Sequence, residues 1–238
     1  MVQYQSTRGH KEKLSFEDVI LSGLAPDKGL YLPDSLTIDN LNHLTEEDLS
    51  YEDFVKTIFI ALDKNSAKYV DDLSLYSGFE NSAEPVLKDL NDTTLIMELF
   101  HGPTKSFKDY ALQPLGAIAD KRLSELGERG LVLVATSGDT GSAAIQAVKE
   151  SENIDIVVLH PADKISDYQR QQMTSVIKDN VLNIAVNGSY DDCQRIAKEI
   201  LSDNPFERRI ISLNSINWLR VMGQVSYYVW LTKQFTSP

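Results

Sequence analysis

The chain has 238 residues, of which 42% are hydrophobic and 24% charged, and its formal net charge is −12. This composition is typical of a globular protein with one large or two modest domains. It excludes a small disulfide-stapled scaffold, because Cys193 is the only cysteine. The acidic balance argues against nucleic acids and anionic membranes as partners, since both require a basic protein surface. No apolar run reaches transmembrane length and the N-terminus is not signal-like, so we expect a cytoplasmic protein.

Residues 1–92 predict a smaller, mainly helical domain. Ser15 and Ser50 each precede an apolar helical pattern and have an acidic residue three positions later, which is typical of a helix N-cap. Residues 26–33 predict a turn followed by extended chain, and a further helical stretch is expected over residues 66–79.

From residue 93 the pattern changes to short apolar runs that alternate with longer helical segments. The predicted strands are TTLIMEL, GLVLVAT, IDIVVL, VLNIAV and RRIISL. Apolar strands without alternation, separated by helices, favour a parallel sheet with helices on both faces. We therefore predict an α/β fold over residues 93–238, with the domain boundary within 80–92. The apolar last helix, around Tyr227 and Trp230, needs a partner surface, which suggests that the domain continues beyond the supplied sequence.

Polar side chains follow three of these strands, where open parallel sheets bind their ligands. They are Lys108 after the first strand, then Thr136, Ser137, Asp139 and Thr140 after the second, and Asn214, Ser215 and Arg220 after the last. Backbone amides at a helix start suit an anion, and a guanidinium suits a phosphate.

Each of these groups also has an ordinary structural interpretation. Lys108 alone could be a solvated surface residue, the loop TSGDTGS a simple helix cap, and Asn214 with Ser215 another cap beside an ion-paired Arg220. The loop lacks the lysine of a P-loop, and its single GxxG does not match the dinucleotide fingerprint, so neither nucleotide site is predicted. The histidines show no metal-ligand spacing, so we expect no metal.

Several segments together resemble the threonine synthases. They are QYQSTRG at 3–9, GLAPDKGLYLP at 23–33, ELFHGPTKSFKDYALQPLG at 98–116, ATSGDTGSAA at 135–144, DIVVLHP at 155–161, QRQQMT at 169–174, NIAVNGSYDDCQ at 183–194 and SLNSINW at 212–218. The resemblance covers nearly the whole chain. It implies a fold type II enzyme related to the tryptophan synthase β subunit, which uses pyridoxal 5′-phosphate (PLP) to convert O-phospho-L-homoserine and water to L-threonine and phosphate.

The resemblance also implies roles for the residues at the strand ends. Lys108 matches the lysine that binds PLP and transfers protons, and Asp139 lies near the cofactor. The remaining residues would bind the substrate, its carboxylate on Thr136, Ser137 and Thr140 and its phosphate on Asn214, Ser215 and Arg220.

The glycine-rich cup that holds the PLP phosphate in this family is absent from the sequence, so we expect an N-terminal portion that is inactive when isolated. Three alternatives stay open: a serine or threonine dehydratase, a threonine synthase-like phospholyase with another substrate, and a noncatalytic scaffold. The sequence does not distinguish a monomer from a homodimer.

Overall fold

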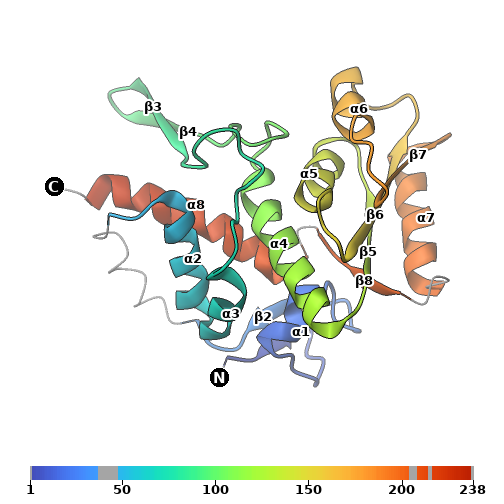
Figure 1. Cartoon of the computed structure of the whole chain (residues 1–238), viewed down its shortest axis with the longest axis horizontal. Coiled ribbons are helices and arrows are strands. Elements are labelled where there is room, and N and C mark those ends of the chain that lie inside the picture. Colours follow the sequence, from blue (N-terminus) through green and yellow to red (C-terminus); the bar gives the residue numbers. More distant parts are fainter. Residues whose placement is uncertain (1, 37–47, 204–207, 214–215, 237–238) are drawn as a thin grey trace.

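The computed structural model describes residues 2–36, 48–203, 208–213 and 216–236 (Figure 1). Its helices are α1 (Phe16–Leu21), α2 (Tyr51–Leu62), α3 (Ala67–Val70), α4 (Asp109–Leu126), α5 (Asp139–Val148), α6 (Asp167–Thr174), α7 (Tyr190–Asp203) and α8 (Trp218–Thr236), with a 3-10 turn at Lys64–Ser66. Its strands are β1 (Tyr4–Ser6), β2 (Tyr31–Pro33), β3 (Val86–Asn91), β4 (Thr94–Glu98), β5 (Gly130–Ala135), β6 (Ile154–Pro161), β7 (Val181–Val186) and β8 (Arg209–Ile211). Within this described part of the chain, no helix has both the length and the apolarity needed to cross a bilayer.

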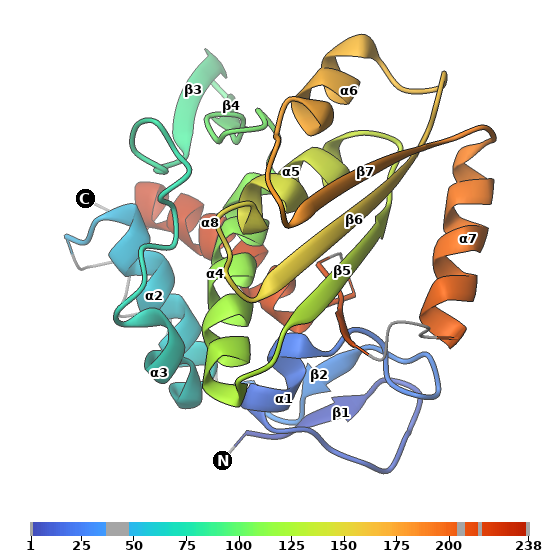
Figure 2. The same cartoon turned by 45° about the vertical axis from the view of Figure 1, so that its right-hand side comes forward.

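A parallel sheet forms the centre of the second part of the chain, and its strand order is β7-β6-β5-β8. Helix α7 covers one face, and α4 and α5 lie on the other (Figure 2). Val132 and Val158 point into the main core beneath α5, whereas Leu133 and Leu159 belong to a smaller cluster with Cys193 of α7. Because both faces are covered, successive strand residues are apolar, and the predicted α/β fold is confirmed.

The strand predicted at TTLIMEL forms, but its assignment to the parallel sheet was wrong. β4 pairs antiparallel with β3 in a separate two-stranded hairpin. The backbone N–H of Thr93 donates to Asn91 Oδ1 at 3.0 Å, which closes a tight turn of the kind that joins neighbouring antiparallel strands. The hairpin strands contain apolar residues that are exposed, with Leu90 62% and Ile96 45% accessible. In the sequence such residues cannot be distinguished from those of a buried strand, which is why the strand was assigned to the sheet.

The two predicted serine caps in the N-terminal part are confirmed. Ser15 Oγ accepts a hydrogen bond from the backbone N–H of Asp18 at 3.2 Å, and Ser50 Oγ accepts one from Asp53 at 3.1 Å. The helix expected over 66–79 is shorter than predicted, because α3 ends at Val70. This part also contains the small antiparallel pair β1–β2. β2 lies in the extended segment predicted within residues 26–33, but its pairing with β1 had not been predicted.

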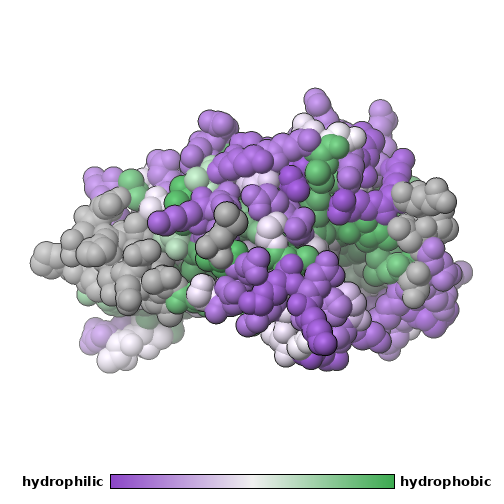
Figure 3. All heavy atoms as spheres, turned by 90° about the horizontal axis from the view of Figure 1, so that it is seen from below, coloured by the Kyte–Doolittle hydropathy of each residue, from purple (hydrophilic) through white to green (hydrophobic). Residues whose placement is uncertain are grey.

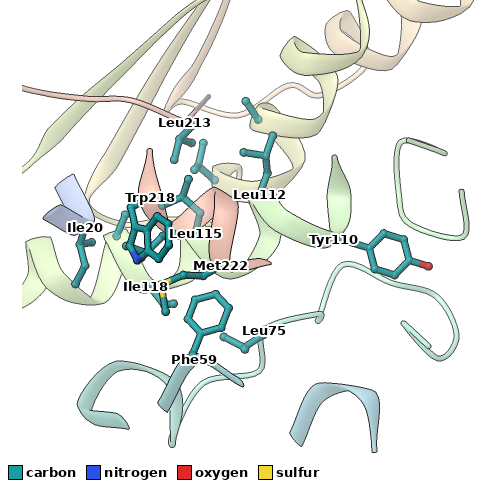
Figure 4. Packing of buried hydrophobic residues seen from close by; sticks show 14 of the residues in the cluster. Ile20, Phe59, Leu75, Tyr110, Leu112, Leu115, Ile118, Leu213, Trp218 and Met222 are labelled. Carbon is teal, nitrogen blue, oxygen red and sulfur yellow. The ribbon is translucent and has the colours of Figure 1, made fainter. Parts of the chain in front are cut away.

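The apolar C-terminal helix finds its partner surface on the N-terminal helices. The ring of Trp230 in α8 lies 5.0 Å from that of Phe54 and 5.5 Å from that of Tyr51, both in α2. Phe59, Leu115 and Met222, from α2, α4 and α8, belong to one continuous core (Figure 4). The partner surface expected for Trp230 is thus supplied by α2, whereas Tyr228 on the same helix is 60% exposed.

Helices α4 and α5 approach each other closely at Gly116. A Cβ atom at this position would lie 2.5 Å from the backbone oxygen of Ala147 and 3.2 Å from its Cβ. A backbone atom cannot move aside as a side chain can, so only glycine allows this contact. Because α4 begins just after Lys108 and α5 begins at Asp139, the contact also determines how these two residues lie relative to each other.

We expect Gly116→Ala to lower the free energy of unfolding by about 1–3 kcal/mol, since the added methyl group separates α4 from α5. Urea denaturation measures the effect. Ser124→Ala, on the exposed side of the same helix, is the control and should leave stability nearly unchanged. Equal stability of both variants would contradict the close contact.

Candidate functional site

Lys108 stands at the start of α4 because the preceding loop is folded around a buried carboxylate. Asp109 accepts hydrogen bonds from the backbone N–H of Thr104 at 2.8 Å and from its hydroxyl at 2.7 Å. A Cβ on Gly102 would lie 2.5 Å from Asp109 Oδ2, so the loop passes directly over the carboxylate. Burial raises the pKa of Asp109, and the two bonds from Thr104 oppose that shift.

The loop between β5 and α5 is held together by the hydroxyl of Thr136. This hydroxyl accepts hydrogen bonds from the backbone N–H groups of Gly138 at 3.0 Å and Gly141 at 3.1 Å, and donates to Gly138 O at 3.1 Å. Gly138 has φ 154°, and a Cβ there would lie 2.4 Å from Gln169 Nε2. Thr136 is buried and its hydroxyl is engaged inside the loop, whereas Ser137 is exposed.

Lys108 and Asp139 meet where the two loops come together. Lys108 Nζ lies 3.6 Å from Asp139 Oδ2, which is an ion pair beyond hydrogen-bond distance. The same ammonium lies 4.8 Å from the centre of the Phe107 ring. A carboxylate and an aromatic face are both favourable neighbours for a positive charge. The Lys108 side chain is 17% exposed and that of Asp139 48%, so the pair stands at the boundary with solvent.

Lys108, Thr140 and Arg220 line one cavity of about 410 Å³, on the side of the sheet that α7 covers. Tyr190 and Lys198 of α7 contribute to the same wall. Seen from below, the surface is mostly hydrophilic, with apolar atoms in a recess on the side where Figure 1 places the sheet and α7 (Figure 3).

Arg220 is the charged residue of this cavity that is least accessible to solvent. The residue is 6% exposed, and its Nε has no hydrogen-bond partner in the described residues. Burial lowers the pKa of Arg220 below its ordinary value. A buried guanidinium with an unpaired N–H is costly unless an anion satisfies it, so this position favours an anionic ligand.

The structure brings four of the eight predicted site residues together. Lys108, Thr140 and Arg220 share the cavity, and Asp139 contacts Lys108. Asn214 and Ser215 lie outside the described residues. Thr136 and Ser137 belong to the same loop but do not line the cavity, so their substrate contacts stay predictions.

Sequence reasoning missed a second layer of polar residues around the site. Gln169 Nε2 in α6 donates to Asp139 Oδ1 at 2.6 Å, and Gln172 Nε2 donates to Thr104 O at 2.8 Å. A helix was expected over residues 165–179, and α6 forms within that range with Ser166 as its N-cap. Nothing in the sequence indicated that the two glutamines reach the lysine loop and the β5–α5 loop.

Comparison with known proteins finds the chain similar to threonine synthases. The family profile "Threonine synthase N terminus" matches residues 3–69. Threonine synthase from Pseudomonas aeruginosa is 41% identical over 246 residues, which cover 100% of this chain and 52% of that protein. The crystal structure of PLP-bound threonine synthase from Brucella melitensis has a TM-score of 0.89 at 36% identity, and the match covers 100% of this chain and 53% of that one. The chain belongs to the threonine synthase family.

Other members of the threonine synthase family match over the same extent. The enzyme structure from yeast has a TM-score of 0.84 at 33% identity and covers 98% of this chain and 50% of that one. Threonine synthase-like 2 from Mus musculus is 37% identical over 243 residues, covering 98% of this chain and 50% of that protein. The chain thus spans about half the length of the curated relatives it matches.

Replacing Thr136 tests whether its hydroxyl is structural in this threonine synthase family member. Thr136→Val should lower the free energy of unfolding by about 1–3 kcal/mol, because Gly138 N–H loses its buried acceptor. Thr136→Ser keeps the hydroxyl and should retain nearly all of the stability. Urea denaturation compares the three proteins. If the valine variant were as stable as the parent, the hydroxyl would be free for a ligand instead.

Proposed function

We propose that the full protein is a threonine synthase, which converts O-phospho-L-homoserine and water to L-threonine and phosphate with PLP as cofactor. The observation that carries this proposal is the shared cavity of Lys108, Thr140 and Arg220 in a chain of this family. The substrate has two anionic groups, a carboxylate and a phosphate. Thr140 can bind the carboxylate, Arg220 can bind the phosphate, and the amine of Lys108 can bind the cofactor. The alternative of an isolated noncatalytic scaffold does not account for the unpaired buried Arg220.

The residues of the cavity fit PLP by their chemistry. Lys108 presents a primary amine, which can bond to the aldehyde of PLP. The unpaired Nε of Arg220 can donate to the phosphate of the substrate. When bound, PLP would withdraw electrons from the amino acid and so permit proton removal next to its carboxylate.

The chain's own residues would then have separate tasks. Lys108 Nζ would hold the cofactor and afterwards move protons of the substrate. Thr140 and the first amides of α5 would hold the carboxylate at a helix N-terminus, together with Ser137. Arg220, with Asn214 and Ser215, would hold the phosphate until it leaves.

We further propose the division into a helical N-terminal domain, residues 1–92, and an α/β cofactor domain from residue 93 onward. The boundary lies in the turn between β3 and β4. We also propose that the protein acts in the cytoplasm and that its partner is a small phosphorylated amino acid.

The decisive experiment incubates the protein, expressed from its complete gene, with PLP and O-phospho-L-homoserine. We expect threonine and inorganic phosphate in equal amounts, and loss of both products together with the visible absorbance of bound PLP in Lys108→Ala. In a parallel incubation with serine or threonine in place of O-phospho-L-homoserine, a dehydratase would release a keto acid. If PLP bound equally well to the alanine variant, Lys108 would not be the cofactor lysine.

A second candidate is a phospholyase that acts on another phosphorylated amino acid. A relative with a different name, threonine synthase-like 2 from Mus musculus, is 37% identical to this chain, close to the 41% of a threonine synthase, so similarity alone does not fix the substrate. The same assay separates the two candidates, because only the first releases threonine.

Arg220→Lys tests the phosphate site. Lysine keeps the charge but cannot offer two parallel N–H donors, so we expect KM for O-phospho-L-homoserine to rise about tenfold or more. Steady-state kinetics measures this. Arg195→Lys, which changes an exposed ion pair on α7, is the matched control and should leave KM unchanged. An unchanged KM in Arg220→Lys would remove Arg220 from the phosphate site.

A further inference from the structure

We propose that Gln169 is a positioning residue for Lys108 and that it acts through the carboxylate of Asp139. Gln169 Nε2 donates to Asp139 Oδ1 at 2.6 Å, and Asp139 Oδ2 lies 3.6 Å from Lys108 Nζ. The three side chains thus form a row from α6 to the start of α4. The catalytic meaning of this row rests on the function proposed above.

The carboxamide of Gln169 is fixed in one orientation. Ser166 Oγ donates to Gln169 Oε1 at 3.1 Å and accepts from the backbone N–H of Gln169 at 3.2 Å. The oxygen of the amide is therefore occupied within α6, so its NH₂ group is directed at Asp139. In the usual capping box this side chain returns to the N-cap backbone, whereas here it reaches another element.

Helix α6 contacts both loops that form the site. Gln172 lies on the same face as Gln169 and binds the carbonyl of Thr104 in the lysine loop. Met173 is fully buried, and a Cβ on Gly141 would lie 2.7 Å from its sulfur, so α6 is also packed against α5. Gln171, by contrast, is exposed and has no side-chain hydrogen bond within the described residues.

This arrangement adjusts the reactivity of the lysine. Asp139 is half exposed and could turn toward water, but the bond from Gln169 keeps its second oxygen facing Lys108. The ion pair holds Lys108 Nζ toward Asp139, so the amine is less free to turn toward an electrophile. The other charged residues lining the cavity are Arg220 of α8 and Lys198 of α7, and neither bonds Gln169.

The test measures how fast Lys108 is acylated in the protein expressed from its complete gene and freed of cofactor. An N-hydroxysuccinimide acetate reagent labels the amine at neutral pH, and peptide mass spectrometry gives the rate at Lys108. Gln169→Ala should raise this rate about twofold to fivefold, as expected for loss of a partly exposed ion pair. Gln171→Ala, two residues further along α6 and without such a bond, should match the parent.

A double-mutant cycle decides whether Gln169 acts through Asp139. Asp139→Asn should raise the rate similarly, and adding Gln169→Ala should raise it no further. An unchanged rate in Gln169→Ala, or an equal increase in the Asp139→Asn background, would overturn the proposal. If Gln169→Ala did not fold, as judged by its melting temperature, Gln169→Glu decides, because its carboxylate repels Asp139 and should raise the rate as well.

This readout is independent of the proposed reaction, because the labelling uses neither PLP nor O-phospho-L-homoserine. Failure to form threonine would contradict the proposed function while leaving the acylation rates valid. Unchanged acylation in an active threonine synthase would contradict only the positioning by Gln169.

Discussion

The site depends on the close contact between α4 and α5. Gly116 is the eighth residue of α4 and Ala147 the ninth of α5, so the helices run in the same direction with their N-termini at similar heights. Lys108 and Asp139 stand at those two N-termini and meet at 3.6 Å. Each helix start carries partial positive charge, so two such starts side by side favour anions. The close packing at Gly116 therefore determines where the charged residues Lys108 and Asp139 lie at the surface.

Two buried ionic groups near the site differ in what surrounds them. Asp109 is satisfied by the amide and hydroxyl of Thr104, so its desolvation is compensated within the lysine loop. Arg220 is almost as buried, yet its Nε has no partner in the described residues. A fully bonded buried charge holds a structure in place, whereas an unsatisfied one is expected where a ligand supplies the missing acceptor. This difference separates the two residues by function although both are buried ionisable groups.

Local patterns predicted the elements better than their assembly. The serine caps at Ser15 and Ser50 and the apolar strands of the parallel sheet were predictable, because a cap or a covered strand depends on nearby residues. The partner of β4 was not, since apolar content does not distinguish an antiparallel hairpin from a central strand. Thr140 and Arg220 could be named from their places after strands of the parallel sheet, whereas Lys108 follows the hairpin and was named by the family resemblance. Gln169 could not, because its contact joins side chains 30 positions apart.

The N-terminal part helps to position Arg220 through hydrogen bonds between α1 and α8. Asn217 Nδ2 donates to the carbonyls of Ile20 and Ser22, each at 3.0 Å, and its Oδ1 accepts from the backbone N–H of Leu219 at 2.9 Å. One buried side chain therefore joins the end of α1 to the first turn of α8. Arg220 lies in that turn, and its backbone N–H donates to Asn217 O at 3.2 Å. The position of the Arg220 backbone, and with it the place where the guanidinium enters the cavity, thus depends on residues near the beginning of the chain. The N-terminal helices and the α/β part are accordingly packed around one core.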